Sequence, residues 1–131
     1  MFRFSQHIVA ALVLSACGGG SNDDEYGATV AAANSKEAEA RALGTESPCS
    51  QVQECGTLAF LQPAPVCSGW TYKPYSLVSA SAGAASAAAA QQVALAGRAR
   101  VLAPSTDILC PAVVEPAPTL ACVTNTCKAS P

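Results

Sequence analysis

Hydrophobic residues gather in a few well-separated stretches of this chain of 131 residues. An apolar run at 8–14 precedes a polar segment at 18–48, and apolar runs at 57–61 and 119–123 flank an alanine-rich stretch at 80–99. Short apolar runs bounded by proline or turn residues favour strands, whereas a long alanine-rich run favours a helix. The pattern therefore predicts an α+β fold with a short N-terminal strand, one long helix and a C-terminal β-hairpin.

The alanine-rich stretch carries the clearest helix signal. Ser76 or Ser79 can cap its start, because a hydroxyl accepts a hydrogen bond from a free N–H of the first turn. Alanine, the strongest helix former, dominates 80–99. Pro104 prevents the helix from continuing. The small side chains would let this helix lie close against a neighbouring surface.

The C-terminal hairpin is predicted around Thr124-Asn125, between the runs 119–123 and 126–128. If its turn has two residues, Cys122 and Cys127 lie directly opposite each other. They then either bond to each other or both face the same layer of the molecule.

The polar segment is predicted to be a flexible acidic tether over 17–48, followed by a disulfide-rich domain over 49–131. One short helix is expected inside the tether: Asn34 can cap it, Glu37 and Arg41 are four residues apart, and Gly44 can end it. Such a short helix is marginal in water, so we expect it to fray unless it packs on something.

The apolar run at the start of the chain is typical of an export signal over residues 1–16. Arg3 and the amino terminus supply its positive charge, and the run at 8–14 is too short to span a bilayer, which needs roughly 20 apolar residues. The adjoining Leu14-Ser15-Ala16-Cys17 resembles the lipobox of bacterial lipoproteins. That resemblance implies cleavage before Cys17 and lipidation of its thiol. Because Gly18 rather than Asp follows, it also implies the outer membrane.

Cysteine usage agrees with export. Apart from Cys17, the chain has an even number of cysteines, which in an exported protein indicates disulfides; they are Cys49, Cys55, Cys67, Cys110, Cys122 and Cys127. Six cysteines allow fifteen pairings, and the sequence does not choose among them. Their two triplets have nearly mirrored spacing, which suggests that the N-terminal triplet is bonded to the C-terminal one.

A metal site is the alternative use of these cysteines. It is disfavoured because His7, the one histidine, leaves with the signal and because the cysteine spacings are wider than a C-x2-C knuckle. The order of a Cys-flanked strand, a helix and a C-x4-C-like end also resembles small cysteine-rich exported bacterial domains of uncharacterised function. That resemblance implies no activity.

Charge and residue types exclude several functions. The mature chain has six basic residues (seven less Arg3) against nine acidic ones, so its net charge is −3, and no basic patch indicates nucleic-acid binding. Without histidine, the domain has no Ser-His or Cys-His nucleophile pair. Its acids, Glu54, Asp107 and Glu115, show no catalytic spacing. We therefore expect neither an enzyme nor a bound metal or cofactor.

One segment is a candidate binding loop. Residues 67–75 hold the only tryptophan and two of the three tyrosines, and Trp70, Tyr72 and Tyr75 are residue types that carry much of the energy at interfaces. The alternative is that Trp70 and Tyr75 fill the small core.

These observations favour a lipoprotein that the lipid on Cys17 anchors to the membrane. Its domain is expected to serve as a structural or interaction module that contacts an envelope protein or a glycan. The alternative is an inhibitor or ligand-binding protein acting on an extracytoplasmic hydrolase or glycan.

Overall fold

The computed structural model describes residues 21–64, 67, 69–105 and 115–131. The predicted signal peptide, Cys17, Asp107 and Cys110 lie outside these residues. The described elements are α1 (Asn22–Leu43), the short 3₁₀ turn η1 (Val52–Glu54), β1 (Cys55–Leu61), β2 (Trp70–Ser76), α2 (Ala82–Leu102), β3 (Thr119–Val123) and β4 (Thr126–Ser130).

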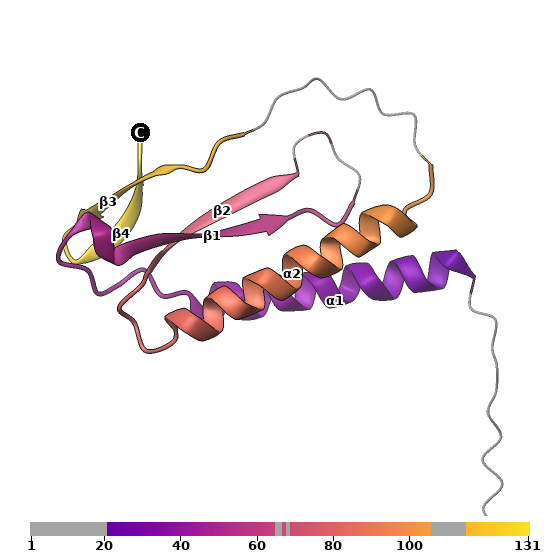
Figure 1. The fold of residues 1–131 in the computed structure, drawn as a ribbon, viewed down its shortest axis with the longest axis horizontal. Coiled ribbons are helices and arrows are strands. Elements are labelled where there is room, and N and C mark those ends of the chain that lie inside the picture. The colour runs from indigo at the N-terminus through magenta and orange to yellow at the C-terminus, as the bar shows by residue number, and fades with distance from the viewer. Residues whose placement is uncertain (1–20, 65–66, 68, 106–114) are drawn as a thin grey trace, which may run out of the picture.

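The two helices lie side by side and antiparallel, and the β1–β2 hairpin covers them on one side (Figure 1). The second hairpin, β3–β4, lies at the end of the molecule where α1 ends and α2 begins (Figure 1). The described residues thus combine two helices with two separate antiparallel hairpins. The predicted α+β class is confirmed, including the short strand, the long helix and the C-terminal hairpin.

Helix α1 is longer than the short helix predicted between Asn34 and Gly44, because it begins at Asn22. The predicted end is confirmed: the N–H of Gly44 donates to the carbonyl oxygen of Ala40 at 2.8 Å. A Cβ at Gly44 would come within 2.5 Å of the Leu58 side chain. Glycine at this position therefore both ends the helix and lets it touch β1.

The prediction of a flexible tether over 17–48 is wrong for the residues of α1, because this helix packs along α2. Its buried residues are Thr29, Ala33 and Ala40, which fall on one side of the helix at spacings of four and seven. Since two of them are alanines, the helix shows no strong apolar stripe and its sequence appears merely polar. Packing on α2 supplies the stability that an isolated helix of this composition lacks.

Polar contacts join the helix pair at both ends. Glu25, in the first turn of α1, forms an ion pair with Arg98 near the end of α2. At the opposite end, the Ser81 hydroxyl donates to the carbonyl oxygen of Leu43 at 2.6 Å. These two contacts fix the register of the antiparallel helices.

Helix α2 begins slightly later than predicted. Its N-cap is Ser81, which makes no capping hydrogen bond with its side chain. The predicted caps are wrong: the Ser79 hydroxyl instead donates to the carbonyl oxygen of Ser76 at 3.1 Å, within the turn before the helix. The helix ends at Leu102, before Pro104, as predicted. Its buried positions are almost all alanine: Ala82, Ala85, Ala88, Ala89, Gln92, Ala96 and Ala99.

The β1–β2 hairpin directs Leu58, Phe60 and Tyr75 at the helices. Leu58 and Phe60 on β1 are almost fully buried, and Tyr75 on β2 joins them in one cluster with alanines of α1 and α2. Phe60 lies opposite Thr71 and Leu58 opposite Lys73. The neighbouring positions on each strand, including Trp70 and Tyr72, therefore face the other side of the hairpin.

Strand β2 was not predicted, since Pro74 argues against a strand. Pro74 lies opposite Thr57 in the hairpin. The N–H of Leu61 bonds to Gln92 instead of β2, whereas the N–H of Gln62 bonds to Gly69. Along a strand, successive N–H groups point alternately toward the neighbouring strand and away from it. By this alternation, the backbone nitrogen of Pro74 points away from β1. Proline is tolerated at such an edge position.

Candidate functional site

Four of the predicted cysteines form two disulfides between the two triplets. Cys122 and Cys127 lie opposite each other on β3 and β4. Cys122 is bonded to Cys49 and Cys127 to Cys55. The two bonds connect residues 73 and 72 positions apart, and thus hold the C-terminal hairpin against the start of β1 and the segment before it. The prediction that the N-terminal triplet is bonded to the C-terminal one is confirmed for these four cysteines.

The turn of the C-terminal hairpin explains this arrangement. Thr124 and Asn125 have positive φ angles of 51° and 62°, as a two-residue type I′ turn requires. That turn puts Cys122 and Cys127 in direct register, and they face one layer instead of bonding to each other. Backbone hydrogen bonds add to the attachment: Cys127 N–H donates to Glu46 at 2.7 Å and Cys49 N–H to Asn125 at 3.3 Å.

The sulfur atoms of Cys49, Cys55 and Cys127 lie within 4.8 Å of one another, a spacing at which cysteines can hold a metal ion. Each of the three is part of a disulfide, and a metal needs the thiolate form. The oxidised structure therefore confirms the disulfides that the sequence favoured over a metal site. Cys67 is disulfide-bonded as well.

The candidate binding loop is a strand, so its prediction as a loop is wrong. Trp70, Tyr72 and Tyr75 all belong to β2, but they do not converge. Tyr75 is buried against the helices, as the core-filling alternative expected, whereas Trp70 is 37% exposed. Tyr72 is half-buried, and its hydroxyl donates to the carbonyl oxygen of Glu115 at 3.0 Å. Trp70 and Tyr72 therefore share the face of the hairpin that points away from the helices.

The acids singled out in the sequence have local roles where the structure describes them. The carboxylate of Glu54 accepts the backbone N–H of Ser50 at 2.6 Å. Glu115 contributes its backbone carbonyl to Tyr72. No pocket is found among the described residues.

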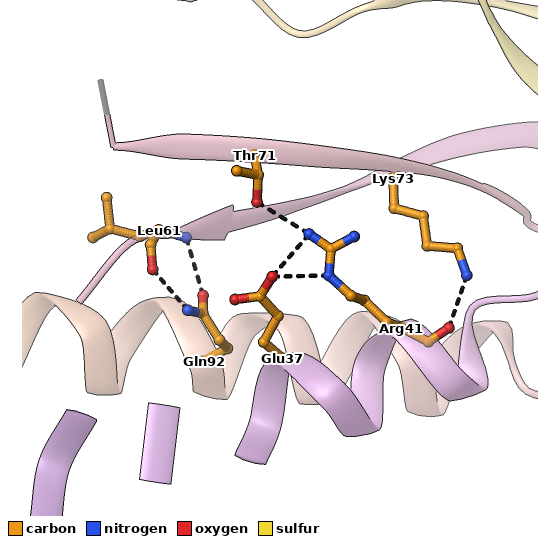
Figure 2. A network of polar contacts seen from close by, with 6 residues as sticks. All are labelled: Glu37, Arg41, Leu61, Thr71, Lys73 and Gln92. Atoms are coloured by element: carbon orange, nitrogen blue, oxygen red, sulfur yellow. Dashed lines mark hydrogen bonds and ion pairs between the residues drawn. The ribbon is translucent and has the colours of Figure 1, made fainter. Parts of the chain in front are cut away.

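A polar network that the sequence did not reveal ties the helices to the first hairpin (Figure 2). Arg41 donates to the carboxylate of Glu37 at 2.8 Å and to the Thr71 hydroxyl at 3.1 Å. Its guanidinium lies 4.4 Å from the centre of the Phe60 ring, a distance typical of a cation–π contact. Lys73 reaches back to the carbonyl oxygen of Arg41 at 2.8 Å. Only the Glu37–Arg41 spacing was visible in the sequence.

Gln92 is the second part of this network. It is fully buried on α2, yet both ends of its amide are bonded to Leu61: the oxygen accepts the backbone N–H at 3.0 Å and the nitrogen donates to the carbonyl at 2.7 Å (Figure 2). The side chain thus takes the place of a neighbouring strand at the edge of β1. A glutamine within an alanine-rich helix is the signal that could have identified it, but its neighbour Gln91 is exposed and looks identical in the sequence.

Arg100 joins the last turn of α2 to the loop end of the first hairpin. Its Nε donates to the carbonyl oxygen of Gln62 at 2.8 Å. A Cβ on Gly69 would lie only 2.1 Å from the Arg100 guanidinium, so a larger residue at this position would displace the end of the Arg100 side chain. The buried Nη2 of Arg100 has no hydrogen-bond partner among the residues that the structure describes.

Comparison of the chain with protein-family models, with curated proteins and with solved structures gives no match. Of the described helices, neither combines the length and apolar character that crossing a membrane requires.

Proposed function

We propose that this chain is a bacterial envelope lipoprotein, in which lipid on Cys17 tethers a rigid disulfide-stapled module outside the cytoplasm. The observation that carries the proposal is the paired disulfide staple, Cys49–Cys122 and Cys55–Cys127. Disulfides of this kind persist in oxidising compartments. The lipobox at Leu14–Cys17 independently indicates export, and it removes the one cysteine that would otherwise make the total odd.

Lipid on Cys17 would be enough to hold the module. One acyl chain gives only marginal membrane binding, whereas two or more anchor a protein stably. The resemblance to lipoproteins implies at least two chains, and Gly18 after the cysteine favours the outer membrane. Because the described helices supply no membrane span, the anchor in this proposal is the lipid itself.

The anchor is tested by Cys17→Ser in cells that process lipoproteins, with Ser15→Ala as a control that keeps the small residue of the lipobox. The serine variant is expected to lose fatty-acid labelling and to leave the membrane fraction, while the control stays labelled and membrane-bound. If a processed, unlabelled Cys17→Ser chain stayed on the membrane, the anchor would be refuted.

We propose that the module works by binding rather than by catalysis. The mature chain has no histidine, and the described Glu54 carboxylate is bonded to its own loop. A body made rigid by disulfides suits a structural partner in the envelope. Crosslinking of the native lipoprotein in intact envelopes, followed by pull-down with the Cys17→Ser chain as the unanchored control, identifies such a partner. Failure of the anchored chain to crosslink to any envelope component would contradict this role.

Inhibition or binding of an extracytoplasmic hydrolase or glycan is the second candidate, and the exposure of Trp70 favours it. Tryptophan is enriched among residues that dominate binding energy, and Tyr72, two residues further along β2, lies on the same face. Titration of isolated cell-wall glycan, with Trp70 fluorescence as the readout, tests this candidate. A saturable change in emission supports it, and an unchanged spectrum counts against it.

A further inference from the structure

We propose that Cys122 is a thiol-exchange site, at which one external thiol rearranges the two bonds of the disulfide staple. The products are two local disulfides, Cys49–Cys55 and Cys122–Cys127. The rearrangement consumes no oxidant and no reductant, and it detaches the β3–β4 hairpin from the start of β1. This inference concerns the staple itself and does not depend on the lipid proposed at Cys17.

The four sulfur atoms gather at the staple end of the molecule, where α1 ends and α2 begins (Figure 1). Those of Cys49, Cys55 and Cys127 all lie within 4.8 Å of one another, and that of Cys122 is bonded to Cys49. The Cys55–Cys127 bond therefore has a sulfur atom of the other bond beside it. Disulfides exchange when a thiolate attacks a disulfide sulfur, so a thiolate formed from one bond is already close to the next.

Cys122 is the position at which an external thiol can enter. It is half-buried, whereas the other three cysteines of the staple are at most 8% exposed. Access to a disulfide helps to decide which of its sulfurs is attacked. Attack at the Cys122 sulfur breaks its bond to Cys49, forms a mixed disulfide between Cys122 and the external thiol, and leaves the Cys49 sulfur as a thiolate.

Cys49 then passes the exchange to the second bond. Its thiolate attacks the sulfur of Cys55, forms the Cys49–Cys55 bond and releases Cys127 as a thiolate. Four of the five residues between Cys49 and Cys55 are exposed, so this short loop has room to adjust as its ends are joined. One thiolate is consumed and one is formed, so the step needs no proton and no electron from outside.

The register of β3 and β4 allows the last step. Cys122 and Cys127 lie directly opposite each other, and the N–H of Cys127 points away from β3, to the carbonyl oxygen of Glu46. They are therefore a non-hydrogen-bonded pair, whose Cα atoms are typically about 4.5 Å apart, within the range that a disulfide spans. The Cys127 thiolate attacks the Cys122 sulfur of the mixed disulfide, forms the cross-strand bond and releases the external thiolate unchanged.

The two arrangements of the staple differ in what holds the C-terminal hairpin. In the structure, two disulfides join it to residues 49 and 55. After exchange, its attachment to that segment depends on backbone hydrogen bonds at Glu46 and Asn125 and on the packing of Leu120. The residues of β3 and β4 are mostly exposed or half-buried, so these contacts are weak. Exchange therefore switches the hairpin between a fixed and a released state.

The test incubates the full protein with reduced glutathione, at a concentration well below that of the protein. Free thiols are then blocked with iodoacetamide, and the unreduced chain is digested with chymotrypsin. Cleavage after Leu43, Leu58 and Leu120 gives fragments 44–58 and 121–131, which carry two cysteines of the staple each. Without glutathione the fragments stay joined; with it, we expect them to separate, each with one internal disulfide. Fragments that stay joined after incubation with glutathione would overturn the proposal.

A variant isolates the step inside the staple. Cys122→Ala leaves the Cys49 thiol beside an intact second bond, with no external thiol present. We expect iodoacetamide to label Cys127 in part of the molecules, because the Cys49 thiolate displaces it from Cys55. Val123→Ala, a change at the neighbouring exposed position, keeps all four cysteines and should leave none of them labelled. Label confined to Cys49 in the Cys122→Ala chain would overturn the exchange.

Discussion

The two buried clusters of the molecule are built from different materials. Between the helices and the first hairpin, alanines surround Leu58, Phe60 and Tyr75. At the staple end, the buried cluster consists of Cys49, Cys55 and Cys127, with Leu120 and Cys122 packed against them. The first cluster holds its elements together by close packing, the second by covalent bonds.

The difference follows from how much apolar surface each end can bury. The helices approach closely because alanine is small, and each contributes several turns of contact. The β3–β4 hairpin has only two short strands, most of whose residues are exposed or half-buried, and an isolated two-stranded hairpin is marginally stable at best. Where burial is too small to hold an element, disulfides restrict the unfolded chain instead.

The largest expected effect is the loss of both staple bonds, by alanine at the four cysteines 49, 55, 122 and 127. Either bond alone closes a loop of more than 70 residues, because the bonded cysteines are 73 and 72 positions apart. Once one bond is in place, the other closes a ring of only roughly a dozen residues. The loss of both bonds therefore costs about 7 kcal/mol in the chain-entropy model. Guanidinium unfolding followed by circular dichroism measures this cost. Removing the Cys49–Cys122 pair alone is expected to cost about 3 kcal/mol, because the remaining bond still closes the long loop.

The same variants sharpen the contrast between the two ends. The β3–β4 hairpin should become accessible to protease, while the helical signal of α1 and α2 is largely kept under mild conditions. A chain without the staple that lost its helices and its hairpin together would show that the two clusters do not act separately.

Next in size is Gln92→Leu, which removes the link between α2 and β1. The N–H and carbonyl of Leu61, whose hydrogen bonds are part-buried, would both lose their partner, at up to about 1–3 kcal/mol for each group. Gln91→Leu, on the neighbouring exposed position, is the control and should change stability by less than about 0.5 kcal/mol. Equal stability of the two variants in urea unfolding would show that the Gln92 bonds contribute nothing.

A smaller effect is expected from Ala96→Leu, which enlarges a fully buried alanine of α2. Overfilling a packed site typically costs about 1–3 kcal/mol. Ala94→Leu makes the same change at an exposed position of the same helix and should be nearly neutral. A thermal midpoint that falls only for Ala96→Leu supports the close approach of the helices, whereas unchanged midpoints in both variants would argue against it.

The smallest effect is expected from Glu37→Gln. The ion pair with Arg41 is partly exposed, and such pairs typically contribute about 0.2–1 kcal/mol. The loss should shrink further at high salt, because salt screens exposed charges. Urea unfolding at low and high salt measures this loss of stability. A loss above about 2 kcal/mol would show that the ion pair is more shielded from solvent than the exposed fractions of its side chains indicate.

The features that local chemistry determines were predictable from the sequence. The Thr124-Asn125 turn, the end of α1 at Gly44, the end of α2 before Pro104 and the joining of the two cysteine triplets all follow from residue types and spacing. The full length of α1 was not predictable, because its buried face consists largely of alanines such as Ala33 and Ala40, which leave no apolar stripe among polar neighbours.

The sites that depend on long-range pairing were out of reach. Strand β2 is concealed by Pro74, which is tolerated only because it lies on the free edge of the hairpin. Gln92 and Gln91 cannot be told apart without knowing which one faces β1. Trp70 and Tyr75 lie in one short segment, but the alternation of the strand sends one outward and the other into the core.

The most direct test of a lipid-anchored, disulfide-stapled module is the intact mass of the protein extracted from membranes without reductant. The expected mass is that of the chain from Cys17 to Pro131 with acyl groups on Cys17, and reduction should add six hydrogens for the six remaining cysteines. A mass corresponding to an unprocessed, unacylated chain from Met1, or one that reduction leaves unchanged, would contradict the account.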